Sequence, residues 1–337
     1  MKIAIHNGDG WNKSVADFCE KNNIVYELVD GYSNDIVEKL SNFDAFFWHF
    51  HHAIPKDILM ARNILFVAEQ MNLRVFPNFK TSWHFDDKIS QKYLLESINA
   101  PIVDSWAFFE LDQALSWLKK DAEYPLVAKL RRGAGSYNVR LIKNYSQAKK
   151  YSKKMFATGV SPTPGYLADT KNKLKVAGNI KGIIKRLKKA PRFFSFIRLG
   201  RRLFPKEKGY VYFQKFIKGN THDLRISVVG GRAWAFRRSV RKNDFRASGS
   251  GLIDYSRENI PLSIVKESIK IAKELQTQSI AFDFVTDESG NYYIVEISYG
   301  YQSNAINSCG GYWDIDLNFH EGDWMPEYFI LNDLLEI

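Results

Sequence analysis

Two carboxylates stand in a predicted hairpin where a divalent cation could be held. The stretch AFDFVTDESGNYYIVEIS has alternating strands around a turn at Asp287–Asn291, and pairing about this turn places Asp283 opposite Glu296. Facing carboxylates repel each other unless a cation lies between them. Carboxylate oxygens suit Mg²⁺, which usually shares its other positions with water and substrate phosphates. The hairpin therefore predicts a Mg²⁺ site, and the alternative is that one carboxylate turns into solvent.

A second predicted hairpin carries three charged residues on one face. Its tight turn is Gly230-Gly231, and a two-residue turn there places Asp223 opposite Arg238, with Arg225 on the same face. A cross-strand salt bridge is one interpretation. The other is a phosphate clamp that also includes Arg246, because arginine side chains bind phosphate oxygens in pairs.

A lysine also precedes a glycine-containing loop. Lys129 ends a predicted strand, and the loop RRGAGS follows it, with Gly133, Gly135 and Ser136. A lysine in this position can hold phosphates while backbone N–H groups surround them. An ordinary hairpin loop is the alternative. The pattern is not a Walker A motif, because no Gly-Lys-Ser/Thr opens a helix here.

The first 80 residues alternate predicted strands and helices, which is typical of an open parallel sheet with helices on both faces. The expected strands are Lys2–His6, Ile24–Val29, Asp44–Phe50 and Arg74–Phe76, and the expected helices are Ser14–Lys21, Asp35–Leu40 and Pro55 to about Met71. Ligands of such sheets bind at the carboxyl ends of strands. The histidines after the third strand, His49, His51 and His52, are therefore either substrate contacts or solvated loop residues.

From Asp86 onward strands predominate, and we expect antiparallel α+β structure. The predicted helices are Asp87 to about Ile98 and Pro261–Leu275. The predicted strands are one that ends at Lys129, then Val139–Ile142, Tyr210–Ile217, Leu224–Val229, Ala233–Val240, Ile280–Thr286 and Tyr292–Ile297.

Composition narrows the class of protein. The 337 residues, 45% of them hydrophobic, are enough for two or three lobes. Two distant cysteines, Cys19 and Cys309, argue against a disulfide scaffold or a zinc site and fit a reducing compartment. Without a leader-like or membrane-spanning apolar run, the expected location is the cytoplasm.

The positive charge is concentrated in one segment. Residues 171–208 contain 14 basic residues and one acidic residue, a net charge of +13, so the formal charge of +11 leaves −2 for the remaining residues. A nucleic-acid partner is therefore disfavoured. Within the segment, Ile180, Ile183, Ile184 and Leu187 share one helical face, and aromatic residues follow. Either this segment packs against the rest of the protein, or it places the protein on an anionic membrane surface.

Taken in order, these motifs resemble the ATP-grasp superfamily over roughly residues 85–300, nearest to ribosomal-protein glutamate ligases and D-alanine–D-alanine ligase. The segments that carry the resemblance are DDKISQKYLLESINAPIV, YPLVAKLRRGAGS, YVYFQKFIKGNTHDLRI, AFRRSVRKNDFRASGSG and the first hairpin. The resemblance implies ATP and Mg²⁺ as cofactors. It assigns nucleotide binding to Lys88, Lys129 and the Gly133, Gly135 and Ser136 loop, adenine to Gln214, Lys215 and Ile217, ribose to Asp223, the transferred phosphate to Arg238 and Arg246, and the metal to Asp283, Glu296 and Ser298. Ser298 stands where the family usually has asparagine.

The resemblance implies an ATP-grasp fold in three parts. An N-terminal open parallel α/β domain (1–84) comes first, then two antiparallel α+β lobes that clasp ATP, one at 85–213 with the basic insertion 171–208 and one at 214–337. The implied activity is ADP-forming ligation of a carboxylate to an amine through an acyl phosphate.

The stretch EISYGYQSNAINSCGGYWD, together with FKTSWHFDDK, also resembles ATP-grasp proteins of bacterial polysaccharide gene clusters, which implies a small-molecule or sugar carboxylate. The alternatives are a kinase or thiol ligase on the same scaffold, a non-catalytic nucleotide-binding or membrane-adaptor protein, and, least favoured, a nucleic-acid-binding module.

Overall fold

The computed structural model describes residues 1–52, 54–133, 138–162, 205–240 and 252–337. The chain divides into two compact units. The first unit comprises Met1–Phe85, Tyr93–Ile102 and Lys218–Ile337, and the second comprises Asp86–Lys92 and Val103–Ile217. The division into three domains at residues 84 and 213 stays a prediction.

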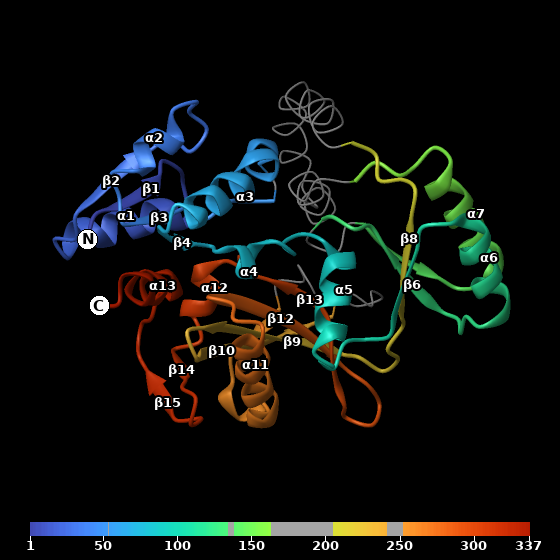
Figure 1. Cartoon of the computed structure of the whole chain (residues 1–337). Helices are drawn as coiled ribbons and strands as arrows, with labels where there is room; N and C mark the ends of the chain where they lie inside the picture. The colour runs from blue at the N-terminus through green and yellow to red at the C-terminus, as the bar shows by residue number, and fades with distance from the viewer. Residues whose placement is uncertain (53, 134–137, 163–204, 241–251) are drawn as a thin grey trace, which may run out of the picture. The chain divides into compact units, whose positions relative to one another are not determined.

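The N-terminal part of the first unit is a four-stranded parallel sheet in the order β2-β1-β3-β4 (Figure 1). Its strands are β1 (Ile3–His6), β2 (Tyr26–Val29), β3 (Ala45–Phe47) and β4 (Arg74–Phe76), and its helices are α1 (Trp11–Lys21), α2 (Ile36–Leu40), α3 (Pro55–Gln70) and α4 (Phe79–Ser82). Both central strands, β1 and β3, are buried along their whole length. Strands covered on both faces need apolar residues throughout, which explains their unbroken hydrophobic runs.

The C-terminal part of the first unit holds a seven-stranded sheet in the order β13-β12-β9-β10-β14-β15, with β11 also paired to β10. Its strands are β9 (His222–Val229), β10 (Arg232–Ser239), β11 (Ile253–Asp254), β12 (Ser279–Thr286), β13 (Tyr292–Ser298), β14 (Gly311–Trp313) and β15 (Phe319–Glu321). Its helical elements are the 3₁₀ turn η1 (Arg257–Asn259), α11 (Leu262–Glu274), α12 (Ser303–Asn307) and α13 (Pro326–Leu335). All its strand pairings are antiparallel.

The two predicted hairpins are confirmed in this sheet. Gly230 and Gly231 join β9 to β10 and have φ angles of +51° and +82°, a backbone conformation that glycine adopts without steric cost. In the other hairpin Asp283 pairs with Glu296, and the register then shifts by one residue between Asp283 and Phe284. The shift is a β-bulge, which the sequence did not predict. Regular pairing about residue 289, the middle of the turn, would have placed Val295 opposite Asp283, so the expected pair of Asp283 and Glu296 forms only because of this bulge, which re-aims side chains locally.

The second unit is built on a four-stranded antiparallel sheet in the order β5-β8-β6-β7, of which Figure 1 labels β6 and β8. Its strands are β5 (Ser105–Phe108), β6 (Leu126–Lys129), β7 (Val139–Ile142) and β8 (Val211–Lys215), and its helices are α6 (Leu111–Lys120) and α7 (Tyr145–Phe156). Helix α5 (Lys88–Ser97) begins in this unit, and its second half belongs to the first unit. The sequence pattern missed α6 and α7.

Three hydrophobic cores hold these elements together. One joins the parallel sheet to α12, α13 and the side chains of Trp234 and Phe236. A second lies between α11 and strands β9, β10, β12 and β13, and the third lies under α6 and α7 in the second unit. Because the first core contains residues from both sheets of the first unit, those sheets form one folded body.

Candidate functional site

Five charged side chains lie on one face of neighbouring strands in the seven-stranded sheet. Directly paired residues of antiparallel strands share a face, and the register pairs Asp223 with Arg238, Arg225 with Asp283, and Asp283 with Glu296. We call these five residues the charge ladder. Their formal charges sum to −1, so cations and anions nearly balance along it.

Asp283 is the centre of the charge ladder. Its two oxygens accept hydrogen bonds of 2.7 Å from Nε and Nη2 of Arg225, and Oδ1 accepts a third, also of 2.7 Å, from Nη2 of Arg238. The facing carboxylates were expected to repel unless a cation lay between them. In this structure the charge of Asp283 is compensated by the two guanidinium groups.

Arg238 bridges two carboxylates. Its Nε lies 2.7 Å from Oδ1 of Asp223 and its Nη2 lies 2.8 Å from Oδ2, while the same Nη2 also donates to Asp283. The cross-strand salt bridge that the sequence allowed is therefore present. Such a bidentate pair fixes the guanidinium plane and its direction.

The protonation of the two aspartates differs because their partners differ. Burial opposes ionisation of Asp283, but Arg225 and Arg238 outweigh it and lower the pKa of Asp283 to about 2. Asp223 has one guanidinium partner for two oxygens, and burial raises the pKa of Asp223 to about 6 in spite of Arg238. Asp283 is thus an anion at neutral pH.

The carboxylates of the ladder fit Mg²⁺ only if another ligand joins them. An ionised carboxylate offers about four lone-pair positions, and Asp283 already uses three for guanidinium N–H groups. The Ser298 hydroxyl donates to the carbonyl of Gly300 at 2.8 Å and accepts from its N–H at 3.3 Å. Among the described residues no three His, Cys, Asp or Glu side chains gather as a metal cluster. This donor set suits a cation that takes most of its ligands from phosphate and water.

In the second unit, Lys88 and the start of the glycine loop lie together. The Nζ of Lys88 donates to the carbonyl of Gly133 at 2.8 Å, and the N–H of Gly133 donates to Asp86 at 2.8 Å. Gly133 has a φ of +112°, and a Cβ there would lie 2.6 Å from the amide of Asn138, so the position requires glycine. The predicted nucleotide lysine therefore contacts the predicted phosphate loop.

Lys129 is the last residue of β6, where it pairs with Tyr212 on one side and Val139 on the other. It is buried, and so is Lys88. Lysines are seldom fully buried without compensating partners. Buried lysines next to a glycine-containing loop would suit the binding of phosphate groups, which carry the compensating negative charge.

Sequence reasoning missed the residues that fix the base of this loop. The hydroxyl of Tyr210 accepts from the N–H of Arg131 at 2.7 Å and donates to Glu207 at 3.0 Å. Burial, together with the nearby Glu207 carboxylate, raises the pKa of Tyr210. Glu207 is the one acidic residue in the basic segment 171–208. A single carboxylate among 14 basic residues was the feature of the sequence that could have indicated a specific role for Glu207.

The predicted adenine residues occupy the end of β8. Gln214 is buried and its amide nitrogen donates to the Ser105 hydroxyl at 3.0 Å, so this side chain ties β8 to β5. Lys215 lies at the surface with Nζ 3.4 Å from Asp104, and Ile217 follows the strand. Gly135, Ser136, Arg246 and residues 171–204 of the basic segment lie outside the described residues.

The three histidines after β3 are not equivalent. His49 stacks on Trp11 with ring centroids 4.3 Å apart, and burial, together with nearby His51 and His52, lowers the pKa of His49 to about 3. His51 is exposed, and its N–H donates to Asp57 at 2.6 Å. His49 is therefore a neutral, packed side chain and not a solvated one.

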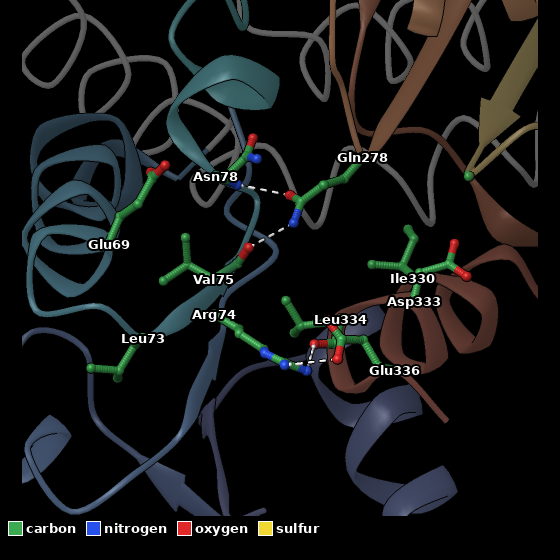
Figure 2. Close-up of a pocket in the computed structure, with 11 residues that line it drawn as sticks. Glu69, Leu73, Arg74, Val75, Asn78, Gln278, Ile330, Asp333, Leu334 and Glu336 are labelled. Atoms are coloured by element: carbon green, nitrogen blue, oxygen red, sulfur yellow. Dashed lines mark hydrogen bonds and ion pairs between the residues drawn. The ribbon is translucent and has the colours of Figure 1, made fainter.

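A cavity of about 390 Å³ in the first unit is lined by residues of which Figure 2 labels ten, and none of the lining residues is a predicted site residue. Several of its polar groups bind one another. Gln278 accepts from the N–H of Asn78 at 2.9 Å and donates to the carbonyl of Val75 at 2.8 Å, and Arg74 pairs with Glu336 at 2.9 Å. We interpret this cavity as a gap in the packing where the parallel sheet and the seven-stranded sheet of the first unit meet.

No family model matches the sequence, and no curated protein matches it. Solved structures do match. D-cycloserine synthetase DcsG aligns with a TM-score of 0.59 and 11% identity over 99% of this chain and 100% of that chain. D-alanine–D-alanine ligase from Bacillus anthracis, complexed with ATP, aligns with a TM-score of 0.55 and 14% identity over 100% and 98%. ATP-grasp ligase PsnB, complexed with a minimal precursor, aligns with a TM-score of 0.58 and 12% identity over 99% and 98%.

This chain has the ATP-grasp fold, which confirms the fold that the sequence resemblance implied. Within the described ranges, no helix has the length and apolarity needed to cross a membrane.

Proposed function

We propose that this protein is an ATP-dependent carboxylate–amine ligase. The observation that carries the proposal is the charge ladder, which sets two arginines and opposed carboxylates on one face of an ATP-grasp sheet. Two of its structural relatives are named as ligases, one of them complexed with ATP. Arginine forks match phosphate oxygens, and ionised carboxylates match the accompanying divalent cation.

The first chemical step is attack of a substrate carboxylate oxygen on the γ-phosphorus of ATP. The bond from that phosphorus to the bridging oxygen breaks, and the products are ADP and an acyl phosphate. Arg238 supplies positive charge where negative charge spreads over the transferred group, which is where electrostatic stabilisation acts. Lys88 and Lys129 of the second unit are the residues that we propose bind nucleotide phosphates. Asp283 and Glu296 are the residues that would hold Mg²⁺, which supplies further charge neutralisation when bound.

In the second step an amine attacks the acyl carbon. The bond from carbon to the phosphate oxygen breaks, inorganic phosphate leaves with the electron pair, and the nitrogen loses a proton to form the amide. Positioning of the two substrates accounts for most of such catalysis. Throughout, Arg225 remains bidentate on Asp283 and keeps that carboxylate ionised.

The substrate that we propose is a sugar carboxylate such as a uronic acid. Its support is the resemblance of the segment from Glu296 to Asp314 to ATP-grasp proteins of polysaccharide gene clusters. The loop after β13 carries Tyr299 and Tyr301, which are buried or partly buried beside Trp11 and His49. Tyr299 is fully buried and its hydroxyl donates to the carbonyl of Phe50 at 2.6 Å, so these aromatic residues pack the loop against the N-terminal sheet and the resemblance alone supports the sugar substrate.

The test is transfer of ¹⁸O from a labelled carboxylate to inorganic phosphate, with ADP release measured on uronic acids, nucleotide sugars and amino acids. Label in phosphate, and trapping of a hydroxamate by hydroxylamine, support the ligase. ADP release with the γ-phosphate retained on a hydroxyl group would instead identify a kinase, and a thioester product would identify a thiol ligase. Asp283→Asn should remove the label transfer, whereas Glu274→Gln, on the exposed side of α11, should leave it unchanged.

The second candidate is a protein that binds nucleotide without turnover. Ser298 favours it, because its hydroxyl is bonded to the backbone of Gly300 and a serine is a weaker metal ligand than an amide or carboxylate. Tight ATP binding with no substrate-dependent ADP release over the whole panel would support this candidate.

A further inference from the structure

The hydrogen bonds of Asp283 leave it room for one divalent cation. Its Oδ1 accepts from Nε of Arg225 and from Nη2 of Arg238, and its Oδ2 accepts from Nη2 of Arg225, each at 2.7 Å. An ionised carboxylate has about two lone pairs on each oxygen. Oδ1 is therefore fully used, and Oδ2 keeps one lone pair. A carboxylate that bridges two cations must give a lone pair to each, so Asp283 cannot be such a bridge.

One neighbouring row on the same face of the sheet has hydroxyl groups and no carboxylate. Residues two apart along a strand share a face, and the register places Ala281 between Ser227 of β9 and Ser298 of β13. Ser227 and Ala281 are buried. The Ser298 hydroxyl is bonded to the N–H and to the carbonyl of Gly300. A second cation on this side of the ladder would therefore find no carboxylate beyond Glu296.

The row on the other side of Asp283 is also poor in ligands. It contains Asp223 of β9 and, past the bulge, Val285 opposite Tyr293. Both oxygens of Asp223 bind the guanidinium group of Arg238, at 2.7 and 2.8 Å. Val285 has no ligand atom in its side chain, and Tyr293 donates to Asp287 at 3.2 Å. Mg²⁺ takes oxygen ligands in a near-octahedral arrangement, and this row adds no carboxylate that is not already bound to an arginine.

Arg225 supplies positive charge beside Asp283. Its guanidinium group lies 2.7 Å from each oxygen of that carboxylate, and its side chain is 21% exposed. A bidentate guanidinium compensates a carboxylate and fixes its plane, as a second cation would otherwise do. Without Arg225, Asp283 would regain one lone pair on each oxygen. The number of cations that Asp283 can ligate therefore depends on this arginine.

We propose that the charge ladder takes a single divalent cation, on Oδ2 of Asp283 and the carboxylate of Glu296, and that Arg225 is the positioning residue that excludes a second cation. The inference rests on the proposed ATP-dependent function, because phosphate and water oxygens must complete the coordination of the ion. Arg225 acts through Asp283 and is not itself a ligand.

Equilibrium dialysis of the full chain against Mn²⁺ and a non-hydrolysable ATP analogue tests the proposal, with the retained Mn²⁺ counted per retained nucleotide. The wild type should hold about one Mn²⁺ per nucleotide, and its electron paramagnetic resonance spectrum should be that of an isolated ion. About two ions per nucleotide, with the spectrum of a spin-coupled pair, would overturn the inference and leave the proposed ligase function standing. Retention of no nucleotide would overturn both.

Arg225→Met removes the N–H donors while it keeps a long side chain. Asp283 then has a free lone pair on each oxygen, so the variant should hold about two Mn²⁺ per nucleotide. Arg232→Met is the matched control. It removes an arginine that is bonded to Asp333 at 2.9 Å at the turn end of β10, outside the ladder, and it should hold about one ion. A folded Arg225→Met variant that still holds one ion would show that Arg225 does not limit the site.

Ser298→Asp tests the same limit with Arg225 in place. Ser298 is half-buried on the edge strand β13, so the substitution adds a carboxylate beside Glu296 on the same face. This variant should also bind a second Mn²⁺, and it carries the test if Arg225→Met does not fold. Urea unfolding shows whether each variant is folded. A folded Ser298→Asp variant with a single bound ion would contradict the argument that missing carboxylates limit the site to one cation.

Discussion

The Nη2 atom of Arg238 lies 2.7 Å from Oδ1 of Asp283, although the two residues are on strands that do not pair with each other. Strand β9 lies between them, and its Asp223 binds the same guanidinium group. One arginine therefore ties three strands together on the face where we place the phosphate chemistry. This contact changes what substitutions in the ladder are expected to do.

Asp283→Asn should destabilise the protein by about 3 kcal/mol, because it leaves two largely buried guanidinium groups short of an anion. Repulsion between Asp283 and Glu296 alone would have suggested a neutral or stabilising effect. Urea unfolding of the variant measures the difference. Glu296→Gln is the comparison, and we expect it to change the free energy of unfolding by less than about 1 kcal/mol. An Asp283→Asn variant as stable as the wild type would show that the arginines do not depend on this carboxylate.

Arg238→Met should lower the free energy of unfolding by about 3–5 kcal/mol, because it leaves the buried carboxylate of Asp223 without its guanidinium partner. Adding Asp223→Asn should recover a large part of that loss, because the unpaired charge is then gone. Activity should stay absent in the double variant if Arg238 also contacts the transferred phosphate. Recovery of both stability and label transfer would assign Arg238 a structural role alone.

Lys129→Ala should weaken ATP binding at least about 10-fold, because it removes a buried positive charge at the strand end before the glycine loop. Isothermal titration calorimetry with ATP and Mg²⁺ measures this. Lys119→Ala, at the exposed end of α6, serves as the control. Equal affinities for the two variants would remove Lys129 from the nucleotide site.

His84 should make the protein less stable in mild acid. It is buried, and burial, reinforced by the positive charge of Arg62, lowers the pKa of His84 to about 4 from 6.5. Between these two values the unfolded chain binds the proton and the folded chain does not, so the free energy of unfolding falls as pH falls. The loss amounts to about 3 kcal/mol by pH 4.

Urea unfolding at pH 7 and near pH 4 checks this contribution, with His84→Gln as the reference. The variant should lose less stability across this interval than the wild type does. Equal losses in both proteins would mean that His84 is protonated in the folded state.

The basic segment 171–208 should bind anionic vesicles at low salt, with about 1 kcal/mol from each basic residue that reaches the surface. Co-sedimentation with phosphatidylserine vesicles, against neutral vesicles as control, measures this binding. Absence of pelleting on both kinds of vesicle would end the membrane hypothesis, and tighter binding to random nucleic acid would favour the alternative partner.

Periodicity and turn residues in the sequence predicted most strands and both hairpins, and the resemblance of the motifs implied the ATP-grasp fold. The alternation around Asp287–Asn291 and the glycine pair at Gly230-Gly231 are local signals, because a hairpin fixes which residues face each other within a few positions. The same local geometry predicted the pair of Asp223 and Arg238. Neither α6 nor α7 was predicted, although Leu111, Ala114, Leu115 and Leu118 recur in α6 at helical spacing.

Tertiary structure decided the rest, because the decisive contacts join strands that are distant in sequence. Asp283 meets Arg225 only because β12 pairs with β9, and it meets Arg238 only because β10 pairs with the other edge of β9. A bulge, and not the turn alone, sets Glu296 opposite Asp283. The structure also shows which face of α3 the core buries, namely the face of Ala61, Ile64, Leu65 and Ala68. Sheet order, bulges and burial arise from packing free energy summed over the whole chain, and no single segment of the sequence contains that sum.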